Sequence, residues 1–117
     1  MIPSNILAAV AELTLMLEKE LRDQRLWQSK APSPQALASE QPYCFDTLSF
    51  PQWLQWIYLP QLKKLVEQGD YLPQESEIGE YADEALSSLA TNEKLLMILH
   101  AIDEACHDNA KHAPRLH

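Results

Sequence analysis

The densest group of reactive side chains in this 117-residue sequence lies between His100 and His107. It reads His-Ala-Ile-Asp-Glu-Ala-Cys-His and contains two imidazoles, two carboxylates and a thiol. Glu104 and His107 have the i,i+3 spacing of the Glu-x-x-His pair found in di-iron helix bundles. On a helix, however, His100 and His107 are about 10.5 Å apart along the axis, too far to share one metal ion with Glu104 between them.

These side chains also form a stripe that points away from the predicted core face of their helix, whereas di-iron ligands project into the interior of a bundle. We therefore predict no metal site. The segment is interpreted as ordinary i,i+4 pairing at the surface, His100 with Glu104 and Asp103 with His107. Cys106 is expected on the core face.

The other candidates for nucleophilic or acid–base chemistry lie around Cys44. This cysteine is in an apolar, aromatic stretch, which favours a buried neutral thiol over a reactive thiolate. Asp46 and Thr47 come just before a predicted helix and are interpreted as turn and capping residues. The sequence contains no G-x-S-x-G motif, Walker loop or dinucleotide fingerprint. It therefore predicts no catalytic residue and no cofactor, and the protein is not expected to be an enzyme.

The elements that carry these residues are predicted to be helices. The sequence has only two glycines, as in proteins built from helices rather than from sheets joined by tight turns. Apolar residues recur at helical spacing, which predicts an all-α fold, a small four-helix bundle in a single domain covering residues 1–117. The four helices are expected at about residues 5–26, 50–68, 77–89 and 92–109.

The second helix has the clearest start and stop signals. Ser49 and Gln52 match the S-x-x-Q capping box, and Gly69 can end the helix in the left-handed conformation. Pro60 removes a backbone donor and is expected to kink the helix. A long proline-containing connection precedes it, and regular structure is not expected over residues 28–48.

Aromatic residues are concentrated in Gln41–Pro60, which holds two tryptophans, two tyrosines, two phenylalanines and three prolines. On a helical wheel, Trp53 and Trp56 lie nearly opposite the main apolar stripe. Two arrangements remain open: the Tyr43–Leu48 segment and Trp27 fold over the tryptophans, or the tryptophans form an exposed patch that binds a partner. We favour the first, and the two can coexist, since a half-covered tryptophan is a common binding anchor.

Charge is unevenly distributed along the chain. The net charge is −8, and the whole excess lies between Leu65 and Glu93, where there is no Lys or Arg. An acidic face repels phosphate backbones, so direct binding of nucleic acid is not expected. No apolar run approaches the ~20 residues that span a bilayer, and no signal peptide is evident. Two cysteines, interpreted as free thiols, favour the cytoplasm.

Several short motifs resemble the YqcC-like family of small bacterial proteins of unassigned function. The motifs are Gln41-Pro42 with Phe45-Asp46-Thr47, Trp53-Leu54-Gln55-Trp56 followed by Pro60, Leu72-Pro73, and the Tyr81…Ala85-Leu86 helix. The resemblance covers most of the chain and is densest over Gln41–Leu86. It implies an all-α four-helix bundle, in agreement with the helical patterns.

The resemblance also implies a connection to tRNA pseudouridine synthase C, through gene neighbourhood and a label that family members often carry. We do not interpret that label as an activity. Pseudouridine synthases are larger proteins of α/β type, with a catalytic aspartate in a basic, RNA-binding cleft, whereas this chain is acidic and helical. The resemblance supplies no catalytic residues, because none are established in the family.

These observations predict a cytoplasmic, non-enzymatic module that binds another protein, with tRNA pseudouridine synthase C as the most specific candidate partner. The alternative is a small-ligand-binding protein with a pocket between the second helix and the Tyr43–Leu48 segment. The candidate partner or ligand surface consists of Trp53, Trp56, Tyr58, Pro60, Tyr43, Phe45 and Asp46. The candidate acidic docking face consists of Glu77, Glu80, Asp83 and Glu84.

Overall fold

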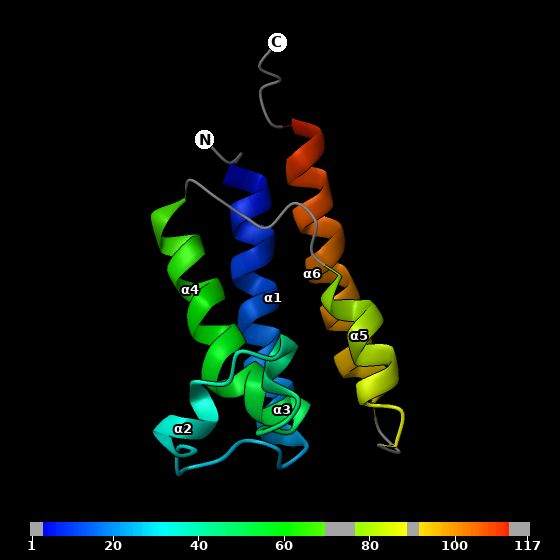
Figure 1. Cartoon of the computed structure of the whole chain (residues 1–117). Helices are drawn as coiled ribbons and strands as arrows, with labels where there is room; N and C mark the ends of the chain where they lie inside the picture. Colours follow the sequence, from blue (N-terminus) through cyan, green and yellow to red (C-terminus); the bar gives the residue numbers. More distant parts are fainter. Residues whose placement is uncertain (1–3, 70–76, 89–91, 113–117) are drawn as a thin grey trace.

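The computed structural model describes residues 4–69, 77–88 and 92–112, with side chains as far as His107. All regular elements in these ranges are helical, and the ranges contain no β-strand. Two long helices, α1 (Ser4–Asp23) and α6 (Glu93–His112), pack side by side (Figure 1). Helix α4 (Leu59–Gln68) packs on α1, and α5 (Ile78–Ala85) packs on α6. The predicted all-α class and the bundle are confirmed.

The second predicted helix is present as three consecutive segments: α3 (Phe50–Trp53), η2 (Leu54–Tyr58) and α4. Its two end signals are confirmed. Ser49 and Gln52 form both hydrogen bonds of the capping box, side chain to backbone in each direction. Gly69 ends the helix at φ 69°, and its N–H donates to the C=O of Leu65.

The middle segment, η2, is a π-helical turn that comes directly before Pro60. Proline has no N–H, and its ring clashes with the carbonyl four residues earlier, here that of Trp56. In the widened turn, the N–H of Leu59 instead donates to the C=O of Leu54, five residues back. The disturbance that Pro60 predicts is therefore a π turn, an insertion that is often found at functional sites.

The long connection between α1 and α3 contains two short helical pieces, so the prediction that it lacks regular structure is wrong there. They are α2 (Pro34–Leu37) and the 3-10 turn η1 (Pro42–Cys44). Each begins with a proline, whose fixed φ suits the first helical position. The hydroxyl of Ser33 also accepts a hydrogen bond from the N–H of Ala36, which caps α2.

The core lies between the apolar faces of α1, the α3–η2–α4 helix, α5 and α6. Its fully buried members are Val10, Leu17, Leu21, Leu54, Leu59, Leu62, Leu86, Leu95, Ile98, Leu99 and Ile102. Cys106 is buried on the same face of α6, as predicted. Leu-sized side chains that leave water in this way each stabilise the fold by about 1.5–3 kcal/mol.

The observed helix ends differ from the predicted ones. Helix α1 ends at Asp23 rather than near residue 26, because Arg25 adopts a left-handed conformation at φ 60°. Helix α5 ends at Ala85, and the predicted end at residue 89 lies outside the described residues, as does the Leu72-Pro73 motif. Within the described ranges, no helix combines the length and apolar character needed to cross a membrane.

Candidate functional site

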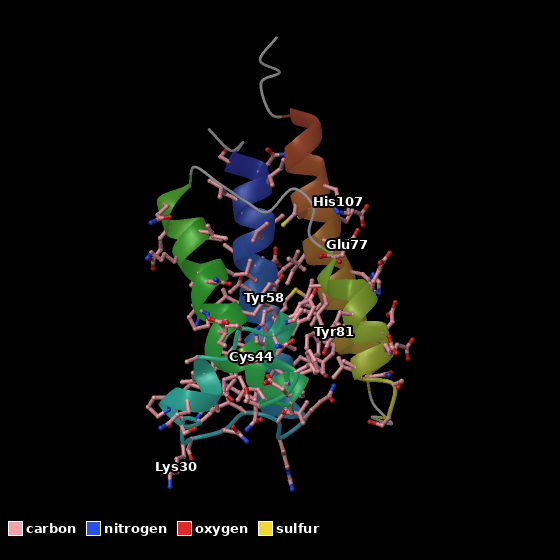
Figure 2. All side chains as sticks on the ribbon, viewed as in Figure 1. Lys30, Cys44, Tyr58, Glu77, Tyr81 and His107 are labelled. Atoms are coloured by element: carbon pink, nitrogen blue, oxygen red, sulfur yellow. The ribbon has the colours of Figure 1, made fainter. Side chains whose placement is uncertain are left out.

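Five aromatic rings from η1, α3, η2 and α5 form one contacting group, here called the aromatic cluster. Its members are Tyr43, Phe50, Trp53, Tyr58 and Tyr81. Tyr43 is central: it stacks on Tyr81 at 4.0 Å between ring centroids and meets Trp53 edge-on at 4.9 Å. Figure 2 labels two members of the cluster, Tyr81 on α5 and Tyr58 nearer the middle of the bundle. The sequence left open whether the tryptophans are covered or exposed, and Trp53 is covered, by the ring of Tyr43.

The hydroxyl of Tyr43 lies in an environment that disfavours its ionisation. Burial is the main cause of its raised pKa, and the negative charge of Asp103 adds to the effect, followed by Tyr81 and Glu77. This tyrosine is therefore neutral well above physiological pH. Its role is structural: the stacking of its ring on Tyr81 holds η1 against α5.

The backbone at Tyr43 and Cys44 is strained, because both residues have positive φ, 55° and 49°. Such values cost of order 1–3 kcal/mol for each non-glycine residue and persist only where the surroundings hold them. The holding contacts here include the N–H of Leu48, which donates to the C=O of Cys44 at 2.8 Å, and the hydroxyl of Thr47, which donates to the C=O of Ala36 at 2.7 Å. Cys44 itself is buried, as predicted.

Beyond this turn, Phe45 and Asp46 lie on the surface. The side chain of Phe45 is 60% exposed, the only aromatic residue among the exposed large hydrophobic ones in the described chain. Asp46 accepts a hydrogen bond of 2.5 Å from the hydroxyl of Ser39. Because this bond closes the loop around Phe45, the phenylalanine ring is presented on a fixed backbone.

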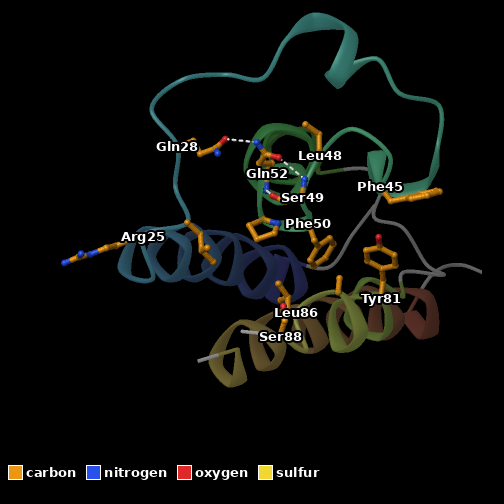
Figure 3. Close-up of a pocket in the computed structure, with 13 residues that line it drawn as sticks. Arg25, Gln28, Phe45, Leu48, Ser49, Phe50, Gln52, Tyr81, Leu86 and Ser88 are labelled. Carbon is orange, nitrogen blue, oxygen red and sulfur yellow. Dashed lines mark hydrogen bonds between the residues drawn. The ribbon is translucent and has the colours of Figure 1, made fainter. Parts of the chain in front are cut away.

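A groove of about 560 Å³ lies beside Phe45, between the end of α1, the start of α3 and α5 (Figure 3). We call it the Phe45 groove. It is lined by Arg25, Leu26, Gln28, Phe45, Leu48, Ser49, Phe50, Pro51, Gln52, Tyr81, Ala85, Leu86 and Ser88. Gln28 and Gln52 are hydrogen-bonded at 3.2 Å along one side, and Arg25 extends away from the other lining residues. The lining of the groove thus combines apolar side chains with polar ones.

Trp56 and Pro60 lie on a different face from Phe45. With Trp27, Gln28 and other residues they line a second groove of about 400 Å³, the Trp27–Trp56 groove. Its polar groups are paired internally: the indole N–H of Trp56 donates to the side-chain oxygen of Gln28 at 3.4 Å. The buried amide of Gln55 bonds the backbone N–H and C=O of Gln28, at 2.8 and 2.7 Å, and so fixes the connection to η2.

Helices α5 and α6 are joined by a polar contact that the sequence analysis missed. The carboxylate of Asp103, only 7% exposed, accepts the N–H of Ile78 at 3.1 Å and that of Gly79 at 2.7 Å. These are first-turn donors of α5, which have no partner within the helix. Asp103 therefore caps a neighbouring helix, and the prediction that it lies at the surface is wrong.

His100 also differs from its prediction. Its Nε2 lies 2.8 Å from Asp83 on α5, rather than pairing along its own helix with Glu104. A Cβ atom added at Gly79 would lie 2.5 Å from Nδ1 of His100, so only glycine permits this approach of the two helices. Gly79 inside a predicted helix is the signal that could have indicated a close helix contact.

The four acidic residues predicted as a docking face, Glu77, Glu80, Asp83 and Glu84, are all exposed. Glu77 is the N-cap residue just before α5, and Glu80, Asp83 and Glu84 lie on the helix itself. Glu84 is one turn from Tyr81, which lines the Phe45 groove. The carboxylate of Asp83 lies 2.8 Å from Nε2 of His100 on α6.

Two further features bear on chemistry in the described residues: the Cys106 thiol and the arrangement of the metal-ligating side chains. Burial and the nearby charge of Asp103 raise the pKa of the Cys106 thiol to about 11, so that it is neutral at physiological pH. No group of three or more His, Cys, Asp or Glu side chains within the described ranges is arranged to hold a metal ion.

The sequence profile of the DUF446 family, described as tRNA pseudouridine synthase C, matches residues 9–105. The chain belongs to the DUF446 family. The predicted resemblance to YqcC-like proteins is thereby confirmed. An uncharacterized protein of Haemophilus influenzae is 34% identical over 93 residues, which cover 80% of this chain and 88% of that protein. The uncharacterized protein YqcC of Escherichia coli is 32% identical over 72 residues, covering 62% of this chain and 66% of YqcC.

The fold of this DUF446 chain matches that of a solved relative. The solution NMR structure of protein YqcC from E. coli superimposes with a TM-score of 0.80 at 26% identity, over 96% of this chain and 94% of that one. A third relative has a different size. The tRNA pseudouridine synthase C of Pectobacterium carotovorum is 35% identical over 57 residues, covering 49% of this chain and 15% of that protein.

Proposed function

We propose that this protein is a cytoplasmic, non-enzymatic accessory module that binds tRNA pseudouridine synthase C. The observation that carries the proposal is the Pectobacterium relative. A protein named for the synthase contains a segment similar to this chain, and that segment is 15% of its length. We assign the named activity to the rest of that protein and an accessory role to the segment. A separate chain of the same kind would then act beside the enzyme by binding it.

Charge and surface supply physical support for this role. The chain has a net charge of −8, and an enzyme that holds tRNA carries a basic surface, so long-range attraction would speed their association. An exposed aromatic side chain next to an apolar groove, as at Phe45, is the kind of feature on which protein interfaces concentrate binding energy. The proposal requires no chemical step from this chain.

The test is direct binding between the purified chain and purified tRNA pseudouridine synthase C from the same organism. Isothermal titration calorimetry after treatment of both proteins with RNase should give a saturable one-to-one complex that weakens as salt is raised. As a control, bovine serum albumin, an unrelated acidic protein, replaces the chain in the titration and should give no heat of binding. If no complex forms at protein concentrations of about 100 μM, the Kd is above that value and the binding free energy is weaker than about −5.5 kcal/mol; this result would refute the proposal.

The alternative function, binding of a small ligand, is favoured by one observation. The Phe45 groove lies between the start of α3 and the Phe45–Leu48 part of the connection, where the pocket is predicted, and its volume of about 560 Å³ is within the range of ligand sites. A thermal-shift screen of metabolites tests it. A compound that raises the melting temperature of the wild type but not of an Ala85→Trp variant, which places a larger side chain at an exposed position in the groove lining, would support this function.

A further inference from the structure

We propose that the Phe45 groove, together with Glu77 and Glu84, is the docking surface for a basic amphipathic segment of the partner protein. This inference rests on the proposed function and specifies which face of the chain binds and what chemistry it recognises. Apolar side chains of the segment would enter the groove beside the Phe45 ring. Lys or Arg side chains on its flank would pair with the two glutamates.

The first support is the fixed presentation of Phe45. Its ring is 60% exposed although the backbone around it is held on both sides, by the Ser39–Asp46 hydrogen bond and by that between Thr47 and Ala36. An exposed aromatic side chain on a rigid loop loses little conformational freedom on binding, so more of its contact energy appears as affinity. Strained backbone, as at Tyr43 and Cys44, is characteristic of functional segments.

The second support is the shape and lining of the groove. Phe45, Pro51, Tyr81 and Ala85 supply apolar side chains from the connection, α3 and α5, and Ser49, Gln52 and Gln28 supply polar groups. Interfaces likewise combine apolar contacts with polar groups that can form hydrogen bonds. The groove is open to solvent, so a segment of a partner protein can enter it.

The third support is the charge of the α5 wall. Glu84 lies one turn from Tyr81, which lines the groove, and Glu77 is the residue just before α5; both glutamates are exposed. Burial is the main cause of the raised pKa of Tyr43, and the charge of Glu77 is among the further causes, which places that carboxylate near the aromatic cluster. Arg25, the cationic residue among the described lining ones, points away from the centre. A segment that lies along this wall is therefore attracted if it is basic and repelled if it is acidic.

The Trp27–Trp56 groove is less suited to this role, although it contains two tryptophans. Its carboxylate Glu18 is already paired with Lys63 at 2.9 Å, and the Trp56 indole with Gln28. A partner would have to replace these bonds, whereas the Phe45 ring is free of such contacts. The exposed Met97 on α6 lines neither of these grooves.

The experiment measures binding of the synthase to the full chain and to variants in matched pairs. Phe45→Ala is compared with Met97→Ala, because the two side chains are 60% and 59% exposed. Glu84→Lys is compared with Glu12→Lys, an equal change of charge at an exposed position about 20 Å along α1 from the groove end at Arg25. Trp56→Ala reports on the other groove. Circular dichroism and the melting temperature establish that each variant is folded.

The proposal predicts that Phe45→Ala raises Kd at least about tenfold, as truncation of an interface anchor does, while Met97→Ala leaves it within twofold. Glu84→Lys should raise Kd about tenfold and lower the association rate and its salt dependence more than Glu12→Lys does. Binding that survives both groove variants, or is lost only in Trp56→Ala, overturns this inference and leaves the proposed function standing. Absence of binding by the wild type overturns the proposed function and the inference together.

Discussion

Replacing Asp103 with alanine should loosen the start of α5 from α6. The buried carboxylate accepts two N–H groups, from Ile78 and Gly79, and both of those residues are themselves buried. Water therefore cannot easily take the place of the lost carboxylate. Two polar donors would remain without partners in the interior, which is the costly outcome when one side of a hydrogen bond is removed.

The expected cost can be worked from these two bonds. A hydrogen bond to a charged group contributes about 1.5–3 kcal/mol net, and loss of a helix cap costs about 0.5–2 kcal/mol. Since burial of the carboxylate offsets part of the gain, we expect Asp103→Ala to lower the free energy of unfolding by about 2–4 kcal/mol. Asp103→Asn keeps one acceptor oxygen, so it should cost about half as much.

Urea denaturation followed by circular dichroism measures these differences. Glu104→Ala is the matched control, because it removes the adjacent, exposed carboxylate of the same helix. Amide hydrogen exchange supplies a local readout, since Ile78 and Gly79 should lose protection in Asp103→Ala before the rest of the bundle does. The reasoning is refuted if the two alanine variants agree within about 0.5 kcal/mol, the usual range for surface substitutions.

Three further predictions follow from other contacts. Gly79→Ala should lower the free energy of unfolding by about 1–3 kcal/mol, because the added Cβ would lie 2.5 Å from the His100 ring. In the double variant, His100→Ala should remove this loss. A coupling free energy between the two substitutions below about 0.5 kcal/mol would contradict the prediction. Burial and the charge of Asp103 raise the pKa of the Cys106 thiol from 9.0 to about 11, so the unfolded chain loses this proton at lower pH than the folded chain does. The free energy of unfolding should therefore fall between pH 9 and 11, by about 2 kcal/mol more in the wild type than in Cys106→Ala. Equal pH slopes of the two proteins in urea denaturation would count against this prediction. Trp53→Ala should lower the free energy of unfolding by about 3 kcal/mol and Trp56→Ala by about 1–2 kcal/mol, because Trp53 contacts three aromatic rings whereas Trp56 borders an open groove. If the denaturation midpoints showed the reverse order, Trp53 would not be the covered tryptophan.

Features that depend on near neighbours in the chain could be predicted from the sequence. The capping box of Ser49 and Gln52 and the left-handed Gly69 need only residues within one helical turn, and both are present as predicted. The ion pair of Glu18 and Arg22 on α1, at 3.3 Å, is of the same local kind, since the two residues are one helical turn apart. The apolar stripes of the long helices gave the correct fold class for the same reason.

Contacts between elements could not be predicted in this way. Asp103 and His100 each have a possible i+4 partner on α6, and a rule for single helices indicates only those pairs. In the structure both side chains reach α5, Asp103 at the backbone of Gly79 and His100 at the side chain of Asp83. That outcome depends on how closely two helices approach, which is a property of the packed chain and not of either segment alone.

The candidate surface shows the same limit most clearly, because residues grouped by composition are separated in space. Tyr43 turns inward and Phe45, two residues later, turns outward, as a consequence of positive φ at Tyr43 and Cys44. Nothing in the sequence indicates this backbone, since neither residue is a glycine. At about 1–3 kcal/mol each, the two left-handed residues cost about 2–6 kcal/mol together. The ring contacts of Tyr43 with Phe50, Trp53 and Tyr81, each about 0.5–1.5 kcal/mol, offset much of this cost. The outward position of Phe45 is therefore maintained by the aromatic cluster, so the buried rings and the proposed docking surface depend on each other.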